Sequence, residues 1–188
     1  MKTSHLQLEW VRYPRATYQA IPSDESDFAP AKTKIEARVT YALDGIHFAW
    51  LKLMSGEETV RAYDFELEAI ASFRFNLEIA TAAYKSANEK LPRILAVNIT
   101  RMLYASAREM LSALTARAPH GSVVIEGVLI EPDDVAIRSD APEDVVMREL
   151  FKVAMNPAKA ISDAKVEKSA KKASGPKRAK SKLPSNRE

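Results

Sequence analysis

The sequence predicts an α+β fold: a four-stranded antiparallel sheet with a long helix and a C-terminal helix on one of its faces. Two observations lead to this prediction. Apolar and polar residues alternate with period two through most of residues 5–75, which is typical of half-buried strands. After residue 91, apolar residues recur at three- and four-residue steps, which is typical of amphipathic helices. Strands that precede helices favour an antiparallel sheet covered on one side.

Four segments account for the predicted strands, at 5–20, 33–43, 46–54 and 60–75. In the first, Leu6, Leu8 and Trp10 fall on one face, and Pro14 cannot donate a ladder hydrogen bond, so we place this strand at an edge or at a bend. The second and third strands are separated by Asp44-Gly45, a strong hairpin signal.

The third strand differs from its neighbours because both of its faces are apolar. Phe48 and Trp50 share one face, and Leu51 and Leu53 lie on the other. This pattern fits a central strand whose outer face is covered, and it equally fits a hydrophobic strip that is left open for a partner or a client chain. The sequence leaves both interpretations open.

The helical half begins with residues 76–90, which form either a short helix or a crossover. A long helix of about 25 residues, roughly 38 Å, is expected to open at Pro92 and to end near 118–119. Small residues in it, such as Ala105 and Ala113, permit close approach of another backbone and favour self-association. Residues 122–132 resemble one more strand, and a final helix is expected to begin at Asp140, with Glu143 at capping-box spacing.

The two parts of the chain before and after residue 157 carry net charges of opposite sign. Residues 157–188 contain ten basic and three acidic residues, a net charge of +7, which leaves −4 on residues 1–156. This tail of Lys, Ala, Ser and Pro has few apolar residues, so we expect it to be disordered, beside a folded domain at 1–156. It serves either as an arm for an acidic partner, such as nucleic acid, anionic lipid or an acidic protein, or as a solubilising extension.

The sequence predicts no catalytic residue, no metal and no cofactor, and therefore no enzyme. Without cysteine there is no thiolate nucleophile, and the five glycines are too few for a phosphate-binding loop. The three histidines, including His47, are read as ordinary surface or half-buried side chains. The acidic run at 131–134 is read as a solvated turn rather than a cation site. With no signal-peptide pattern and no membrane span, we expect a cytoplasmic protein.

Three stretches carry a resemblance to a known family. Residues 16–22, ATYQAIP, have an aromatic residue followed shortly by Ala and Pro. The long helix opens with Pro92, followed by Arg-Ile-Leu, and continues with Tyr104, Ala107, Arg108 and Glu109. In this order the stretches resemble the SecB family of protein-export chaperones, over roughly residues 6–155.

This resemblance implies a homotetramer that holds unfolded preproteins in surface hydrophobic grooves without ATP and delivers them to the translocase motor. The groove would lie between the sheet and the crossover before the long helix, and the oligomer interface would lie on that helix. The residues implied for the groove are Phe48, Trp50, Tyr84 and Leu91. Those expected at the interface are Tyr104, Ala107, Met110 and Leu111.

The sequence also departs from the SecB pattern. Two residues are inserted between Tyr104 and Ala107, and Arg15 and Gln19 stand near the positions of the carboxylates that dock the motor. These departures keep two alternatives open: a SecB-like chaperone of a toxin–antitoxin system, and a non-enzymatic adaptor that binds nucleic acid or an acidic partner through the tail.

Overall fold

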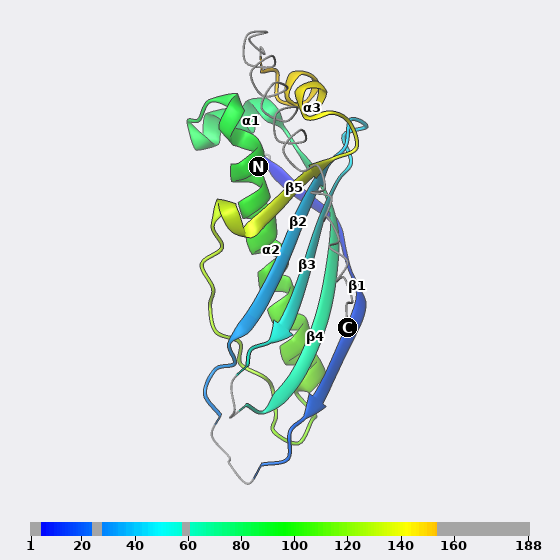
Figure 1. Cartoon of the computed structure of the whole chain (residues 1–188), viewed down its shortest axis with the longest axis vertical. Helices are drawn as coiled ribbons and strands as arrows, with labels where there is room; N and C mark the ends of the chain where they lie inside the picture. The colour runs from blue at the N-terminus through cyan, green and yellow to red at the C-terminus, as the bar shows by residue number, and fades with distance from the viewer. Residues whose placement is uncertain (1–4, 24–27, 58–60, 154–188) are drawn as a thin grey trace, which may run out of the picture. The chain divides into compact units, whose positions relative to one another are not determined.

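Five strands form one mixed sheet in the order β1-β4-β3-β2-β5 (Figure 1). The computed structural model describes residues 5–23, 28–57 and 61–153. The first four strands are antiparallel to their neighbours, and β5 runs parallel to β2. The bounds are β1 Leu6–Ala20, β2 Thr33–Tyr41, β3 His47–Ser55, β4 Tyr63–Phe75 and β5 Val135–Ser139.

The sheet therefore corrects the predicted fold class, which had four antiparallel strands. The sequence signal for the fifth strand is weak because β5 has five residues and only Val135 among them is buried. The strand-like segment at 122–132 instead makes one isolated bridge, between Ala31 and Ile125, and is otherwise irregular up to a 3₁₀ turn at Pro132–Asp134. Its alternation is genuine, since Val123 and Ile125 are buried, but it does not extend the sheet.

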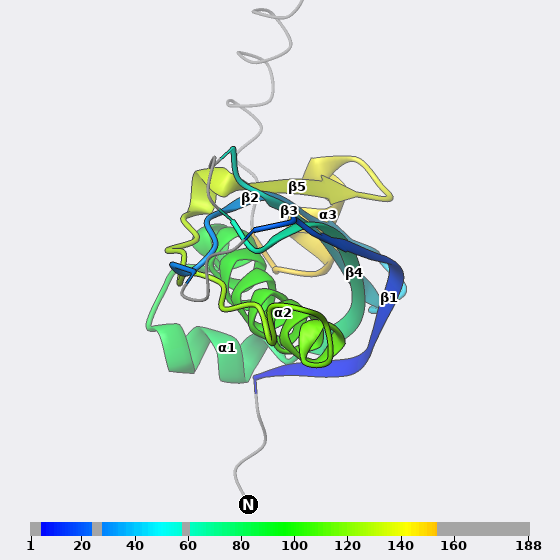
Figure 2. The same cartoon turned by 90° about the horizontal axis from the view of Figure 1, so that it is seen from below.

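The long helix α2, Leu91–Thr115, confirms the predicted helix, with Pro92 in its first turn. The segment before it contains a short helix, α1 Leu77–Tyr84, followed by a 3₁₀ turn at Asn88–Lys90. Asn76 caps α1 by accepting a hydrogen bond from the Ile79 amide at 3.0 Å. Both α1 and α2 lie on one side of the curled sheet (Figure 2).

The last helix, α3 Glu143–Glu149, is shorter than predicted and begins after Pro142. Asp140 does not cap it. Its Oδ2 accepts from the Leu43 amide at 3.3 Å, and its own amide donates to the Tyr41 carbonyl at 3.2 Å. Asp140 thus ties the end of β5 to the turn that follows β2.

The core lies between α2 and the inner face of the sheet. Alternate residues of the strands meet the buried face of α2, and the fully buried side chains include Val39, Leu51, Leu53, Leu67, Phe73, Leu95, Ile99, Leu103 and Leu111. Tyr41 closes one end of this core, where its hydroxyl donates to the Pro92 carbonyl at 2.6 Å and its ring packs against Phe151. Within the described residues, no helix has the length and apolarity needed to cross a membrane.

The edge strand β1 is irregular, as Pro14 predicts. Its pairing with β4 shifts between Leu8 and Trp10 and again between Arg12 and Arg15. The first shift turns Trp10 to the face opposite Leu8, so the prediction that Leu6, Leu8 and Trp10 share one face is wrong. The predicted basic tail, 157–188, lies outside the described residues.

Candidate functional site

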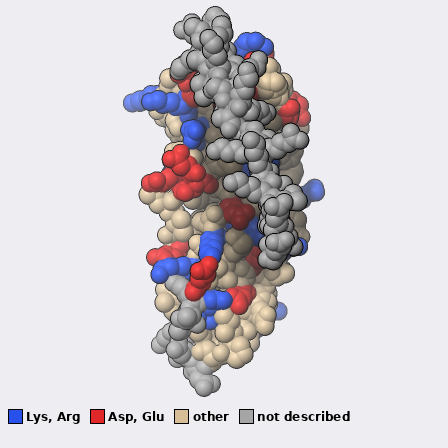
Figure 3. Space-filling model, in the orientation of Figure 1, with Lys and Arg blue, Asp and Glu red and all other residues tan. Residues whose placement is uncertain are grey.

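The outer face of the sheet is the one turned away from α2. Along β3, Ala49, Leu51 and Leu53 are buried on the inner side, while Phe48 and Trp50 point outward. Figures 1 and 3 view this face, and Figure 2 shows that α1 and α2 lie on the other side. Within the described residues no helix covers it, so the apolar outer side of β3 is the first candidate for a binding surface.

Cross-strand pairing arranges this surface in rows. One row contains Trp10, Ser72, Phe48, Thr40 and Arg138, and the next contains Arg12, Ile70, Trp50, Arg38 and Ala136. We call six of these residues the aromatic–arginine patch: Trp10, Arg12, Arg38, Phe48, Trp50 and Ile70.

The rings and guanidinium groups of the patch contact one another. The ring centroids of Trp10 and Phe48 are 6.2 Å apart. The Arg12 guanidinium lies 4.9 Å from the centre of the Trp10 ring, and that of Arg38 lies 5.1 Å from the Trp50 ring. Phe48 remains 40% exposed, and both tryptophans are half-buried. The patch therefore offers apolar area and positive charge in the same place.

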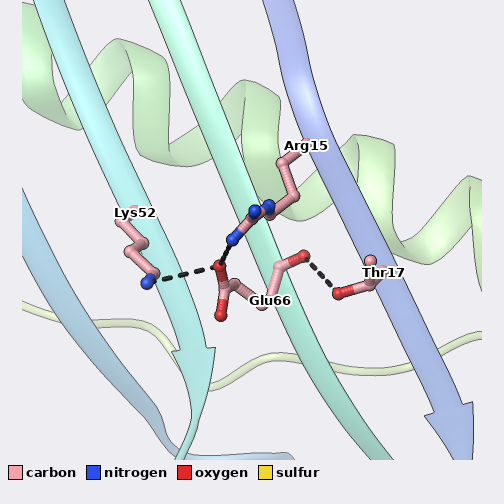
Figure 4. A network of polar contacts seen from close by, with 4 residues as sticks. All are labelled: Arg15, Thr17, Lys52 and Glu66. Carbon is pink, nitrogen blue, oxygen red and sulfur yellow. Dashed lines mark hydrogen bonds and ion pairs between the residues drawn. The ribbon is translucent and has the colours of Figure 1, made fainter.

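A polar network bounds the patch along the strands. Glu66 on β4 accepts from Arg15 on β1 at 2.8 Å and lies 3.3 Å from the Lys52 ammonium on β3 (Figure 4). These two cations hold the pKa of Glu66 below its usual value, and Glu66 in turn raises that of Arg15. Basic and acidic side chains lie side by side over this part of the face (Figure 3). Such exposed pairs add little stability, and they leave this region close to neutral.

The structure does not bring the four predicted groove residues together. Phe48 and Trp50 lie on the patch, but Tyr84 ends α1 on the other side of the sheet. There its hydroxyl accepts from Asn98 at 3.1 Å and lies 2.5 Å from His5 Nε2. Leu91 is fully buried because the first turn of α2 directs it into the core, so it cannot contact a client. Its place in the predicted groove is therefore corrected.

The predicted interface residues are also mostly internal. Tyr104, Ala107 and Leu111 are buried within the protomer, and the Tyr104 hydroxyl donates at 2.7 Å to the Glu126 carbonyl, on the segment that follows α2. Met110 is partly buried. The side of α2 turned to solvent carries other residues, which we call the α2 stripe: Met102, Ala105, Glu109 and Ala113.

Exposed apolar residues flank this stripe on the segment that follows α2. Val124 is 61% exposed and Leu129 is 71% exposed. A hollow lies between Val124 and the helix, where it is lined by Ala105, Ala113, Arg108 and Glu109 among others. The sequence indicated Ala105 and Ala113 as small residues that permit close approach of another backbone, but it missed Val124, because the apolar residues that predicted a strand at 122–132 are split between the core and solvent.

His47 is buried, in contrast to the sequence interpretation. Its side chain lies on the inner side of the sheet at 2% exposure, against the rings of Tyr41, Phe73 and Phe75. The Ala42 amide donates to Nδ1 at 3.2 Å, so that nitrogen carries no proton. Burial lowers the pKa of His47 to about 4, although Asp44 and Asp140 act in the opposite direction.

The acidic run forms a turn. Asp134 accepts from the Glu131 amide at 2.8 Å, which makes a capping box around the 3₁₀ turn, and Asp133 pairs loosely with Arg93 at 3.4 Å. Over the part of the chain that the structure describes, no three His, Cys, Asp or Glu side chains are grouped as metal ligands would be.

Comparisons with known proteins bear on the fold alone. No protein-family model matches the sequence, and no curated protein matches it. Among solved structures, the fold is similar to that of the SecB-like chaperone Rv1957 of Mycobacterium tuberculosis, in complex with a ChAD peptide from the Rv1956 HigA1 antitoxin. The alignment covers 66% of this chain and 88% of the other, at 16% identity and a TM-score of 0.46. Similarity this low does not transfer function, so function has to be inferred from the chain's own surfaces.

Proposed function

We propose that the protein is an ATP-independent chaperone that binds unfolded polypeptide segments on its exposed apolar surfaces. The observation that carries this proposal is the aromatic–arginine patch, whose exposed rings and guanidinium groups lie on four adjacent strands, β1, β4, β3 and β2. Unfolded chains expose apolar side chains in no fixed order, and burying them against such a patch is favourable without a shaped pocket.

The polar groups next to the patch residues also suit binding rather than chemistry. Ser72, which lies between Trp10 and Phe48, is buried, and its hydroxyl donates to Glu9 at 2.9 Å. Glu9 in turn pairs with Arg74 at 2.7 Å. These groups are occupied by one another, so what the patch presents to a ligand is rings and guanidinium groups.

Two classes of client fit this proposal. The SecB resemblance implies preproteins on their way to the export translocase. The complex of Rv1957 with an antitoxin peptide suggests an antitoxin as the second class. Co-purification of the tagged full chain from its own cells, followed by identification of the bound proteins, would separate the two classes.

We predict that the double variant F48S/W50S loses most of its ability to suppress aggregation. Each serine removes a large apolar contact from the patch, and the two together are expected to weaken client binding about tenfold or more, since 1.4 kcal/mol corresponds to a factor of ten. The measurement is light scattering of a chemically denatured client diluted into equimolar chaperone.

The matched control is Y18S, which removes an aromatic side chain about as exposed as Phe48, at 42% against 40%, eight residues along β1 from Trp10. It should protect the client as well as the wild type does, and circular dichroism should show all variants folded. Failure of the wild-type protein with several clients would overturn the chaperone proposal. Equal protection by F48S/W50S would instead move the client site elsewhere.

We further propose that the protein assembles as a homotetramer, with the α2 stripe at an interface between copies. The support is the stripe's small side chains, its exposed Met102 and the exposed Val124 beside it, which together with the polar Glu109 and Ser112 form a shallow surface that another backbone can approach closely. None of the stripe residues is needed for the protomer core.

The variant A113E is expected to reduce the native mass to that of a smaller species while leaving the protomer folded. A charged side chain in the middle of a close helix contact has to be desolvated without a partner, which costs several kcal/mol. Native mass spectrometry measures the change, and A83E, the same substitution at an exposed position of α1, is the control. A wild type that is monomeric at micromolar concentration would contradict the proposal.

A further inference from the structure

The two rows of the aromatic–arginine patch carry a charge imbalance. Their ten positions include three arginines, Arg12, Arg38 and Arg138, and no Asp or Glu. The next row along the strands is balanced, because Arg15 and Lys52 stand there with Glu68 and Glu36. Positive charge is therefore concentrated where the exposed rings are.

The arginines of the patch differ from other cations on this face in having no acidic partner. Arg74 pairs with Glu9, Arg15 with Glu66 and Lys34 with Glu57. Within the described residues, neither Arg12 nor Arg38 forms an ion pair, and each lies against a tryptophan ring instead. Contact with a ring does not neutralise a guanidinium or occupy all of its N–H donors, so hydrogen-bonding capacity remains at both sites.

A ligand that covers the rings also removes water from these charged guanidinium groups. A segment that buries Trp50 also removes water from Arg38, which pairs with it across the strands, and an uncompensated charge is costly to desolvate. A carboxylate on the ligand offsets that cost, because guanidinium binds carboxylate through two parallel hydrogen bonds. A lysine or arginine on the ligand adds like-charge repulsion.

The spacing suits one extended chain. Phe48 and Trp50 are two residues apart on β3, and Arg38 is one strand away from Trp50. Side chains two apart on a strand are about 7 Å apart, and neighbouring strands are about 4.8 Å apart. A carboxylate within two residues of an apolar side chain in an extended ligand therefore reaches Arg38 or Arg12 while the apolar group covers a ring.

On this basis we propose that the patch selects client segments in which aromatic or aliphatic residues are flanked by Asp or Glu. The proposal rests on the proposed chaperone function and names the class of client that this surface prefers. The arginines set the preference, and the rings supply most of the contact area.

The test compares three labelled 15-residue peptides by fluorescence anisotropy with the full-length protein. All contain the same two Phe and two Leu residues, and their flanking positions carry Glu, Gln or Lys. The Glu peptide is expected to bind about tenfold more tightly than the Lys peptide, with the Gln peptide between them. The tail's net charge of +7 also attracts acidic peptides. The decisive quantity is therefore the affinity for the Glu peptide divided by the affinity for the Gln peptide, the Glu-to-Gln ratio, and how patch variants change it.

Two variants and one control isolate the patch. R12Q/R38Q should lower the Glu-to-Gln ratio, leaving only the part that the tail's charge contributes. Its affinity for the Gln peptide should stay within about twofold of the wild-type value. R12K/R38K retains the charges without the flat guanidinium and should restore part of the ratio, which also guards against a folding defect in the first variant. R15Q, at a cation already paired with Glu66, should leave the ratio unchanged.

The outcomes are distinct. If R12Q/R38Q leaves the ratio unchanged, or if the Lys peptide binds as tightly as the Glu peptide, the acidic preference is overturned and the chaperone proposal stands. If no peptide binds, including the Gln peptide, the chaperone proposal itself fails. If single-stranded oligouridine displaces the Glu peptide at lower concentration, and does so only with Arg12 and Arg38 present, the ligand is a polynucleotide and the peptide preference is overturned.

Discussion

Replacing Leu111 by alanine is expected to lower the free energy of unfolding by about 2–5 kcal/mol. The side chain is fully buried between α2 and the sheet, and its removal leaves a cavity that the packed strands cannot fill. Urea unfolding followed by circular dichroism, at a fixed protein concentration, measures the loss. The effect is large because an ordinary domain is stable by only about 5–15 kcal/mol.

The same variant decides where Leu111 acts. The sequence places it at an interface between copies, whereas its burial within the protomer predicts an effect on the fold. R93A, at an exposed position in the first turn of the same helix and outside the α2 stripe, serves as the control and should change stability by no more than about 0.5 kcal/mol. If L111A dissociated an oligomer and left the unfolding midpoint of the protomer unchanged, the intramolecular assignment would be wrong.

The contribution of His47 to the free energy of unfolding is expected to fall by about 3 kcal/mol as the pH is lowered from 6.5 to 4. The pKa of His47 is about 4 in the fold and about 6.5 in the unfolded chain, so the unfolded state binds the proton first. The contribution is complete above pH 6.5 and is lost progressively as the pH falls toward 4. Unfolding in urea at a series of pH values gives the slope of the free energy of unfolding against pH.

The variant His47→Asn isolates this contribution. Its side-chain oxygen can accept the Ala42 amide that Nδ1 accepts in the wild type, and it does not titrate in this range. The carboxylates of the protein still titrate in both proteins, so the prediction concerns the difference between them. Identical slopes for wild type and His47→Asn between pH 6.5 and 4 would show that His47 takes up a proton equally in both states.

The fold was predictable where the buried residues of an element recur at a regular spacing in the sequence. The strands β2, β3 and β4 and the helix α2 each bury one continuous face, and their length of nine or more residues makes the periodicity visible. The strand β5 buries only Val135, and its partner β2 lies almost 100 residues earlier, so neither periodicity nor a local turn signals it. A short parallel edge strand is defined by its partner rather than by its own residues.

The candidate site was predictable only in part. Phe48 and Trp50 stand out in the sequence because their strand is apolar on both faces, but Trp10, Arg12 and Arg38 join them through cross-strand register. The bulge after Leu8 decides that Trp10 faces outward, and no periodic pattern reports a bulge. The predicted oligomer interface was wrong because the sequence does not show which side of the long helix faces the core. Tyr104 and Leu111 are buried in the protomer, while Met102 and Ala113 face solvent.

The position of the aromatic–arginine patch has a consequence for how a client would leave it. Phe48, Trp50 and Ile70 stand on β3 and β4, each of which is hydrogen-bonded to a strand on both sides and anchored by the core beneath. Strands that are paired on both sides cannot swing apart to eject a bound segment without breaking the sheet. Release would then be governed by kinetic partitioning: after each spontaneous dissociation the client either folds, passes to another protein, or rebinds.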